Sequence, residues 1–133
     1  MVPAFNEEAN LENTVKEIKK SVDERLETYE ILIFDDGSRD RTGYIADKLV
    51  KIYKNVRTFH NKKNSGTGYC YSKGLEFAKY EHYMYIPGDN QFPAQALSLM
   101  LQKLGSADII IPYVKNMHIR PFQGGLSRQS TLS

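Results

Sequence analysis

Two adjacent carboxylates, Asp35 and Asp36, end an apolar run and precede a Gly-Ser turn. Like charges at one point cost free energy unless other groups offset them. One interpretation is an ordinary strand-to-helix turn in which Asp36 is simply solvated. The other is that one carboxylate organises the loop while its neighbour accepts hydrogen bonds from a ligand N–H, such as the imide or ring amino group of a nucleobase.

Two glycines, Gly66 and Gly68, open a helical pattern that follows an expected strand. Glycines in that place can cradle a phosphate. A dinucleotide fingerprint needs a third glycine where Tyr71 stands, and a P-loop needs a Gly-Lys-Ser/Thr sequence that does not follow. The pattern therefore excludes both motifs, and for the glycines by themselves it favours a tight turn with close helix packing.

Asp89 and Gln91 alternate within the stretch IPGDNQFP. On an extended backbone, alternate side chains point to the same side. A carboxylate and an amide carbonyl supply oxygen ligands, which Mg²⁺ and Mn²⁺ prefer, usually together with phosphate oxygens and water. The alternative, favoured for this motif in isolation, is a polar loop before a helix that starts at Pro93.

The histidines and a lysine pair carry weaker signals. The histidines lack the spacing of metal ligands and are interpreted as ordinary residues: His60, His82 and His118. Lys62 and Lys63 are interpreted as part of a solvated loop, with phosphate contact as the alternative.

These residues need a scaffold, and the pattern around them alternates between strand and helix. Apolar runs predict strands over residues 30–34, 56–60, 83–86 and 107–113. Apolar stripes with helical spacing predict helices over residues 11–22, 45–52 and 97–104, with a weaker helix over 68–79 and Asn6 as the N-cap of the first. The class is therefore α/β with a mostly parallel sheet. Ligands bind at the carboxyl ends of strands in such sheets, and the three polar motifs all follow strands.

Composition limits the function further. The chain has 133 residues with 41% hydrophobic and 26% charged residues, which is the size and balance of one small domain. A net charge of +2 gives no reason to expect a nucleic-acid partner. One cysteine, Cys70, excludes an internal disulfide framework and fits a reducing compartment. No apolar run reaches the roughly 20 residues of a membrane span.

Both ends of the chain are interpreted as cut. The strand expected before Pro3 is reduced to Met1 and Val2, and the chain stops in a polar, Gly-containing stretch after the last predicted strand. We therefore expect residues 1–133 to form a single, partial domain that is marginally stable alone.

Taken together, five motifs resemble a family 2 glycosyltransferase with the GT-A fold, most closely the polyprenyl-phosphate sugar synthases. They are VPAFNEEANL, YEILIFDDGSRDRT, NSGTGYCYSKG, IPGDNQFP and ADIIIPY. The resemblance covers nearly the whole chain in order and spacing. It implies a Rossmann-like, mostly parallel sheet with helices on both faces, which is incomplete here, and a nucleotide-sugar site where the first strands end.

The resemblance also implies roles for individual residues. Asp36 would hydrogen-bond the base, while Asp35 would brace the loop. Three residues would line the base and ribose: Pro3, Phe5 and Glu7. Arg120 would approach a donor or lipid phosphate.

In the family, the metal motif is usually Asp-any-Asp followed two residues later by Gln. Pro87 stands at the first aspartate here, while Asp89 and Gln91 remain as the implied ligands of Mg²⁺ or Mn²⁺. Asp89 would be catalytic, because the metal it holds offsets charge on the leaving diphosphate.

The implied activity is transfer of a sugar from a nucleotide-diphospho-sugar to an acceptor, either a polyprenyl phosphate or a cell-surface glycan precursor. The alternative is a non-catalytic or truncated nucleotide-binding remnant of such an enzyme, which Pro87 and the cut ends favour. The expected location is the cytoplasm or the cytoplasmic face of a membrane, with any membrane association arising from segments outside this chain.

Overall fold

A three-stranded parallel sheet forms the centre of the molecule. The computed structural model describes residues 1–112, in which β1 (Val2–Ala4), β2 (Ile31–Asp35) and β3 (Val56–His60) lie in the order β1-β2-β3. Parallel pairing aligns Ala4 with Asp35 and Asp35 with His60. Since all three strands run in one direction, the loops that follow them meet at one edge of the sheet.

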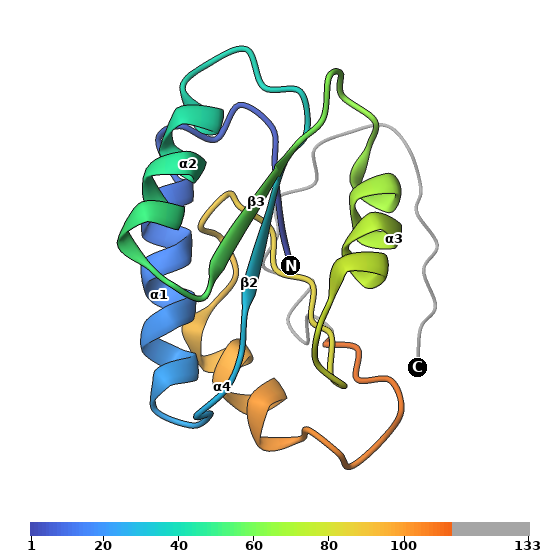
Figure 1. The fold of residues 1–133 in the computed structure, drawn as a ribbon. Coiled ribbons are helices and arrows are strands. Elements are labelled where there is room, and N and C mark those ends of the chain that lie inside the picture. Colours follow the sequence, from blue (N-terminus) through green and yellow to red (C-terminus); the bar gives the residue numbers. More distant parts are fainter. Residues whose placement is uncertain (113–133) are drawn as a thin grey trace, which may run out of the picture.

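Helices cover both faces of this sheet (Figure 1). On one face lie α1 (Leu11–Asp23) and α2 (Thr42–Ile52), with α4 (Ala94–Gln102) packed against α1. On the other face lies α3 (Thr67–Phe77), which contacts β1 and β2. This arrangement confirms the predicted α/β class and is that of a partial GT-A, Rossmann-like fold.

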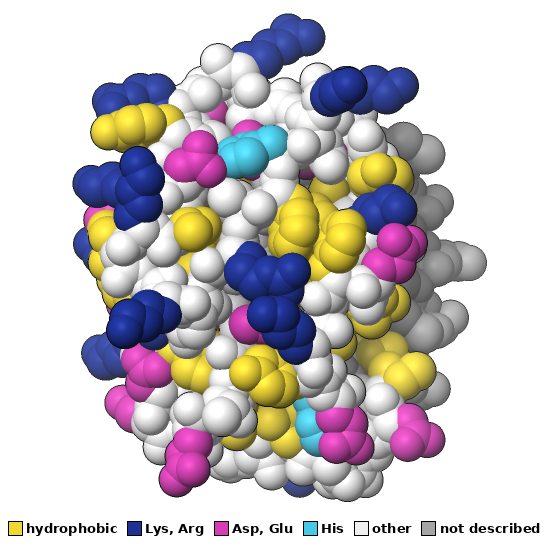
Figure 2. Space-filling model, viewed as in Figure 1, with side chains coloured by type: hydrophobic (Ala, Val, Ile, Leu, Met, Phe, Trp, Pro, Cys, Tyr) yellow, Lys and Arg dark blue, Asp and Glu magenta, His cyan; other side chains and the backbone are white. Residues whose placement is uncertain are grey.

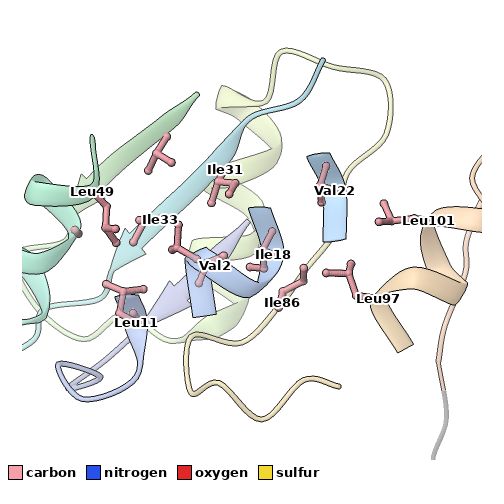
Figure 3. Close-up of a cluster of buried hydrophobic side chains, with 14 residues drawn as sticks. Val2, Leu11, Ile18, Val22, Ile31, Ile33, Leu49, Ile86, Leu97 and Leu101 are labelled. Carbon is pink, nitrogen blue, oxygen red and sulfur yellow. The ribbon is translucent and has the colours of Figure 1, made fainter. Parts of the chain in front are cut away.

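The main core lies between the sheet and the layer of α1, α2 and α4. Val2 and Ile33 from the sheet face Ile18 of α1, and Leu97 of α4 closes the cluster from outside (Figure 3). Each fully buried side chain of this kind stabilises the fold by about 1.5–3 kcal/mol relative to exposure. Every residue of β2 is buried, because helices cover both of its faces.

A smaller core fills the space under α3. Its buried members are Met1, Leu32, Phe34 and Cys70. The ring of Phe34 stacks on Phe59, which in turn stacks on Phe77 at centroid distances of 4.8 and 4.7 Å. These rings attach the end of α3 to the sheet, while Cys70, near the start of the helix, is buried in the same core.

The segment 84–88 continues the sheet beyond β1 without forming a regular strand. Met1 N–H donates to the carbonyl of Met84 at 2.7 Å, and Ile86 N–H donates to the carbonyl of Met1 at 3.0 Å. Gly88 N–H then donates to the carbonyl of Pro3 at 3.1 Å. The segment predicted as a strand over 83–86 therefore lies along β1, and Gly88 arrives beside the end of that strand.

Two sequence-based expectations are wrong in this region. Residues 107–112 of the predicted strand 107–113 form no strand, and Ile109 and Ile111 are 76% and 73% exposed, because no second layer covers this run in the described part of the chain. Asn6 is not the N-cap of the first helix, which begins at Leu11 after Asn10. Asn6 instead adopts a left-handed backbone conformation with φ 53° and bonds to the loop after β2.

An apolar cavity of about 320 Å³ lies at the opposite edge of the sheet, where the strands begin. Its walls include Ile18 and Val22 of α1, Ile31 of β2, Met84 and Leu101. None of the helices formed by residues 1–112 has the length and apolarity needed to cross a membrane.

Candidate functional site

The ends of the three strands are locked in register, which brings the predicted motifs together. Asp36 N–H donates to the carbonyl of Ala4 at 2.8 Å, and Asn61 N–H donates to the carbonyl of Asp35 at 2.8 Å. The parallel ladder thus continues one residue past β2 and one residue past β3. Side chains from three segments distant in sequence therefore meet at the carboxyl edge of the sheet.

The Asp36 carboxylate accepts three hydrogen bonds at this edge. Its Oδ1 accepts hydrogen bonds from Asn61 Nδ2 and Ser65 N–H at 2.8 Å each, and its Oδ2 accepts one from Gly66 N–H at 2.9 Å. The residue is only 5% exposed. Burial acts to raise the pKa of the carboxyl, but these hydrogen bonds outweigh burial and lower it, so Asp36 is a buried anion. Its first role is therefore to hold the loop 61–66.

Gly37 allows that loop to approach. Its backbone has φ 73°, a left-handed conformation that favours glycine. A Cβ at this position would lie 2.4 Å from the carbonyl carbon of Lys63 and 2.5 Å from the backbone nitrogen of Asn64. Backbone atoms cannot move aside as side chains do, so only glycine lets the two loops touch.

Cys70 lies beside Asp36 and Asn61. It is fully buried on α3, and Asn61 Nδ2 contacts its Sγ at 3.5 Å. Burial, followed by the negative charge of Asp36, raises the pKa of the Cys70 thiol to about 11. The thiol is therefore protonated and unreactive at neutral pH, which makes it a packing residue here.

Asp35 is paired with a histidine that sequence reasoning dismissed. His60 Nδ1 lies 2.8 Å from Asp35 Oδ2, and His60 Nε2 lies 2.8 Å from Asp47 Oδ1 on α2. The other oxygen of Asp35 accepts a hydrogen bond from Ser38 N–H at 3.1 Å, as expected for a residue that braces the turn. The position of His60 at the end of a predicted strand could have indicated this contact, because parallel register places His60 beside Asp35.

The loop after β1 interlocks with the loop after β2. Asn6 N–H donates to Ser38 Oγ at 3.0 Å, and Arg39 N–H donates to Asn6 Oδ1 at 2.9 Å. Glu7 N–H donates to Thr42 Oγ1 at 2.8 Å. These bonds fix the backbone directly after Phe5, a residue that is 41% exposed at this edge.

The other two predicted donor-binding residues make mainly structural contacts. Pro3 is half-buried within β1, where its carbonyl accepts the bond from Gly88. The Glu7 carboxylate accepts a hydrogen bond from Asn10 Nδ2 at 2.8 Å. Pro3, Phe5 and Glu7 thus lie together at the predicted edge, with only the Phe5 side chain largely free.

Asp89 and Gln91 lie in a turn. The extended backbone that would point both side chains to the same side, which the sequence suggested, does not form. Gln91 N–H donates to Asp89 Oδ1 at 3.0 Å, and Asn90 between them has φ 57°. Within residues 1–112 there is no group of three or more His, Cys, Asp or Glu side chains placed to hold a metal. One carboxylate and one exposed amide fit a Mg²⁺ or Mn²⁺ ion that takes its remaining ligands from phosphate and water.

Basic side chains surround the same edge. Lys and Arg side chains gather over the loops after β2 and β3 at the upper rim of the molecule (Figure 2). The exposed basic residues on these loops are Arg39, Arg41, Lys62 and Lys63. Such a rim attracts anions by long-range electrostatics. Arg120, predicted to approach a phosphate, lies outside the described residues.

A parallel sheet whose loops converge in this way is the arrangement of an α/β domain, a class in which ligands bind at the carboxyl edge of the strands. The sequence profile of Glycosyl transferase family 2 matches residues 1–130, and the chain belongs to that family.

Several known proteins are similar to the chain. An uncharacterized protein of Methanocaldococcus jannaschii is 34% identical over 126 residues, covering 90% of this chain and 52% of that protein. An uncharacterized glycosyltransferase of Bacillus subtilis, YkcC, is 29% identical over 77% of this chain and 32% of its own length. Glycosyltransferase AglD of Haloferax volcanii is 26% identical over 81% of this chain and 18% of its own length. The chain thus spans about half or less of these relatives.

Proposed function

We propose that residues 1–133 form the partial, donor-binding domain of a glycosyltransferase that uses a nucleotide-diphospho-sugar. The observation that carries the proposal is that the loops after β1, β2 and β3 meet at one edge of the sheet, where Asp36 holds the loop 61–66, together with membership of family 2. In this proposal Phe5, with Pro3 and Glu7, borders the base and ribose. A carboxylate offers about four acceptor positions, of which Asp36 uses three for the loop, and the Cys70 thiol is a further neighbouring donor. In this proposal a base N–H takes the place of that weak thiol donor.

The diphosphate would lie between the basic rim and the turn at Asp89. Lys62 and Lys63 supply positive charge close to the bound donor. Asp89 and Gln91 would hold Mg²⁺ or Mn²⁺, and a cation there would offset charge on the leaving diphosphate. Arg120 is proposed to bind a donor or lipid phosphate.

The reaction is a substitution at the anomeric carbon of the sugar. The bond from this carbon to the diphosphate oxygen breaks, and a bond to an acceptor oxygen forms, for which we propose a polyprenyl phosphate or a glycan precursor. A phosphate acceptor is already ionised at neutral pH and needs no general base. The proposed setting is the cytoplasm or the cytoplasmic face of a membrane, with attachment supplied by segments outside this chain.

A non-catalytic nucleotide-binding role is the second candidate, because Pro87 stands where the family motif has its first aspartate. Titration with UDP-sugars and GDP-sugars, with and without Mn²⁺, tests donor binding, and release of free sugar tests turnover. Binding with turnover supports the enzyme, whereas binding without turnover supports the second role. A chain that binds neither nucleotide class would refute both.

A further inference from the structure

His60 makes two hydrogen bonds that together define its protonation. Its Nδ1 and Nε2 each lie 2.8 Å from a carboxylate oxygen, of Asp35 and Asp47 respectively. An ionised carboxylate only accepts hydrogen bonds, so each ring nitrogen must donate. A neutral imidazole carries one proton and can satisfy only one of these contacts. Only the imidazolium cation donates from both nitrogens, so this geometry favours the cation.

The surroundings of His60 favour that cation. The charged groups that act on the ring are Asp35 from β2 and Asp47 from α2, and both are acidic. Partial burial opposes the charge, but the two hydrogen bonds and the negative charges outweigh it and raise the pKa of His60 above its ordinary value. Gly43 of α2 leaves room for the pair, because a Cβ there would lie 2.7 Å from Asp35 Oδ2 and 3.4 Å from His60 Nδ1.

A chain of hydrogen bonds connects His60 to the carboxyl edge of the sheet, where the nucleotide-sugar is proposed to bind. Asp35 is 7% exposed, and its second oxygen accepts the bond from Ser38 N–H. Ser38 Oγ accepts the bond from Asn6 N–H, next to the exposed ring of Phe5. The turn after β2 and the loop after β1 thus depend on where the Asp35 carboxylate points.

We propose that His60 is a positioning residue of the nucleotide site, and that in its cationic form it holds Asp35 and thereby the turn that carries Asp36. The cation also offsets the repulsion between the two adjacent carboxylates. When His60 loses its proton, the positive charge beside Asp35 and one of the two carboxylate contacts are lost. The repulsion between Asp35 and Asp36 is then no longer offset, so the turn loosens and nucleotide binding weakens as the pH rises. This inference rests on the proposed function, because it concerns the same site.

The first test does not depend on nucleotide binding. NMR titration of the full chain follows the His60 ring proton and the Ser38 amide across about pH 5.5 to 8.5, the range around an ordinary histidine pKa. We expect His60 to titrate above its ordinary value and the Ser38 amide to shift at the same midpoint. Asp47→Asn removes the charge of a side chain that is 56% exposed and leaves the contact between His60 and Asp35 intact. It should lower the titration midpoints of the His60 ring and of the Ser38 amide together. A Ser38 amide that does not follow His60 would overturn the proposal.

The second test measures binding of UDP and GDP over the same pH range. His60→Asn keeps a neutral N–H near the position of Nδ1 but cannot titrate, so it is the matched control for phosphate ionisation. We expect the ratio of the wild-type dissociation constant to that of His60→Asn to rise about three- to tenfold as the pH increases. This change is smaller than the full contribution of a hydrogen bond to a charged group. A constant ratio would overturn the role of His60 in binding. Failure of both proteins to bind at any pH would instead overturn the proposed function, and the role of His60 with it.

Discussion

Replacing Asp36 by asparagine tests whether its carboxylate holds the site together. The asparagine carbonyl can still accept bonds from Asn61 and Ser65, but each weakens because the acceptor loses its charge. Its NH₂ group would face Gly66 N–H, a donor against a donor, and leave that group unpaired. An unsatisfied buried donor costs about 1–3 kcal/mol, so with the weakened bonds we expect a loss of about 2–4 kcal/mol. Relief of repulsion from Asp35 returns part of this.

The assay is thermal unfolding of the wild type and the variant under identical conditions. A loss of this size lowers the melting temperature of a domain this long by on the order of 10 °C. Asp89→Asn is the matched control, because it makes the same chemical change at an aspartate whose carboxylate accepts one short-range bond, from Gln91 N–H. We expect this control to stay within about 0.5–1 kcal/mol of the wild type.

Nucleotide binding gives the second readout. If Asp36 also accepts a bond from the base, the folded variant should bind nucleotide about ten- to a hundredfold more weakly, measured below its melting transition. An Asp36→Asn protein that melts with the wild type would show that the three bonds do not hold the loop. A variant that melts early but binds normally when folded would remove Asp36 from the base site.

Three further predictions concern other parts of the chain. Gly37→Ala should unfold more easily than Gly66→Ala in denaturant titrations, because both have positive φ but only Gly37 meets backbone atoms, and equal losses would contradict the close approach. Calorimetric titration should show that Mn²⁺ and a nucleoside diphosphate bind cooperatively and that Asp89→Ala abolishes the coupling; metal-independent nucleotide affinity would exclude the ion. An apolar extension of about four residues before Met1 should enter the 320 Å³ cavity in line with β1 and raise the melting temperature by a few degrees. An extension of the same length made of Gly and Asp residues should not raise it.

Periodicity predicted most of the scaffold, because burial imposes it directly. The strand over 56–60 coincides with β3, and the strand over 30–34 differs from β2 by one residue at each end. The run ADIIIPY shows the limit of this reasoning. Its continuous apolar residues indicate a strand covered on both faces, but periodicity does not say whether covering layers are present.

The site was predictable as a place but not as a set of contacts. Polar residues after successive strands predicted that Asp36 and the segment before Gly66 would meet. What Asp36 binds there depends on backbone groups 29 and 30 residues further along the chain, which no local pattern encodes. His60 was missed for the same reason, because its importance comes from the register between β2 and β3.

Cys70 gives the chain a built-in reporter of motion at this site. It is the sole cysteine, it is completely covered, and Asn61 lies across its sulfur. A thiol reagent can reach it only when the region around Asp36 opens, so the labelling rate at a fixed pH counts those openings in the native protein. A nucleotide that closes the loops should slow the labelling, and the slowing would give its affinity for the closed state without any engineered probe.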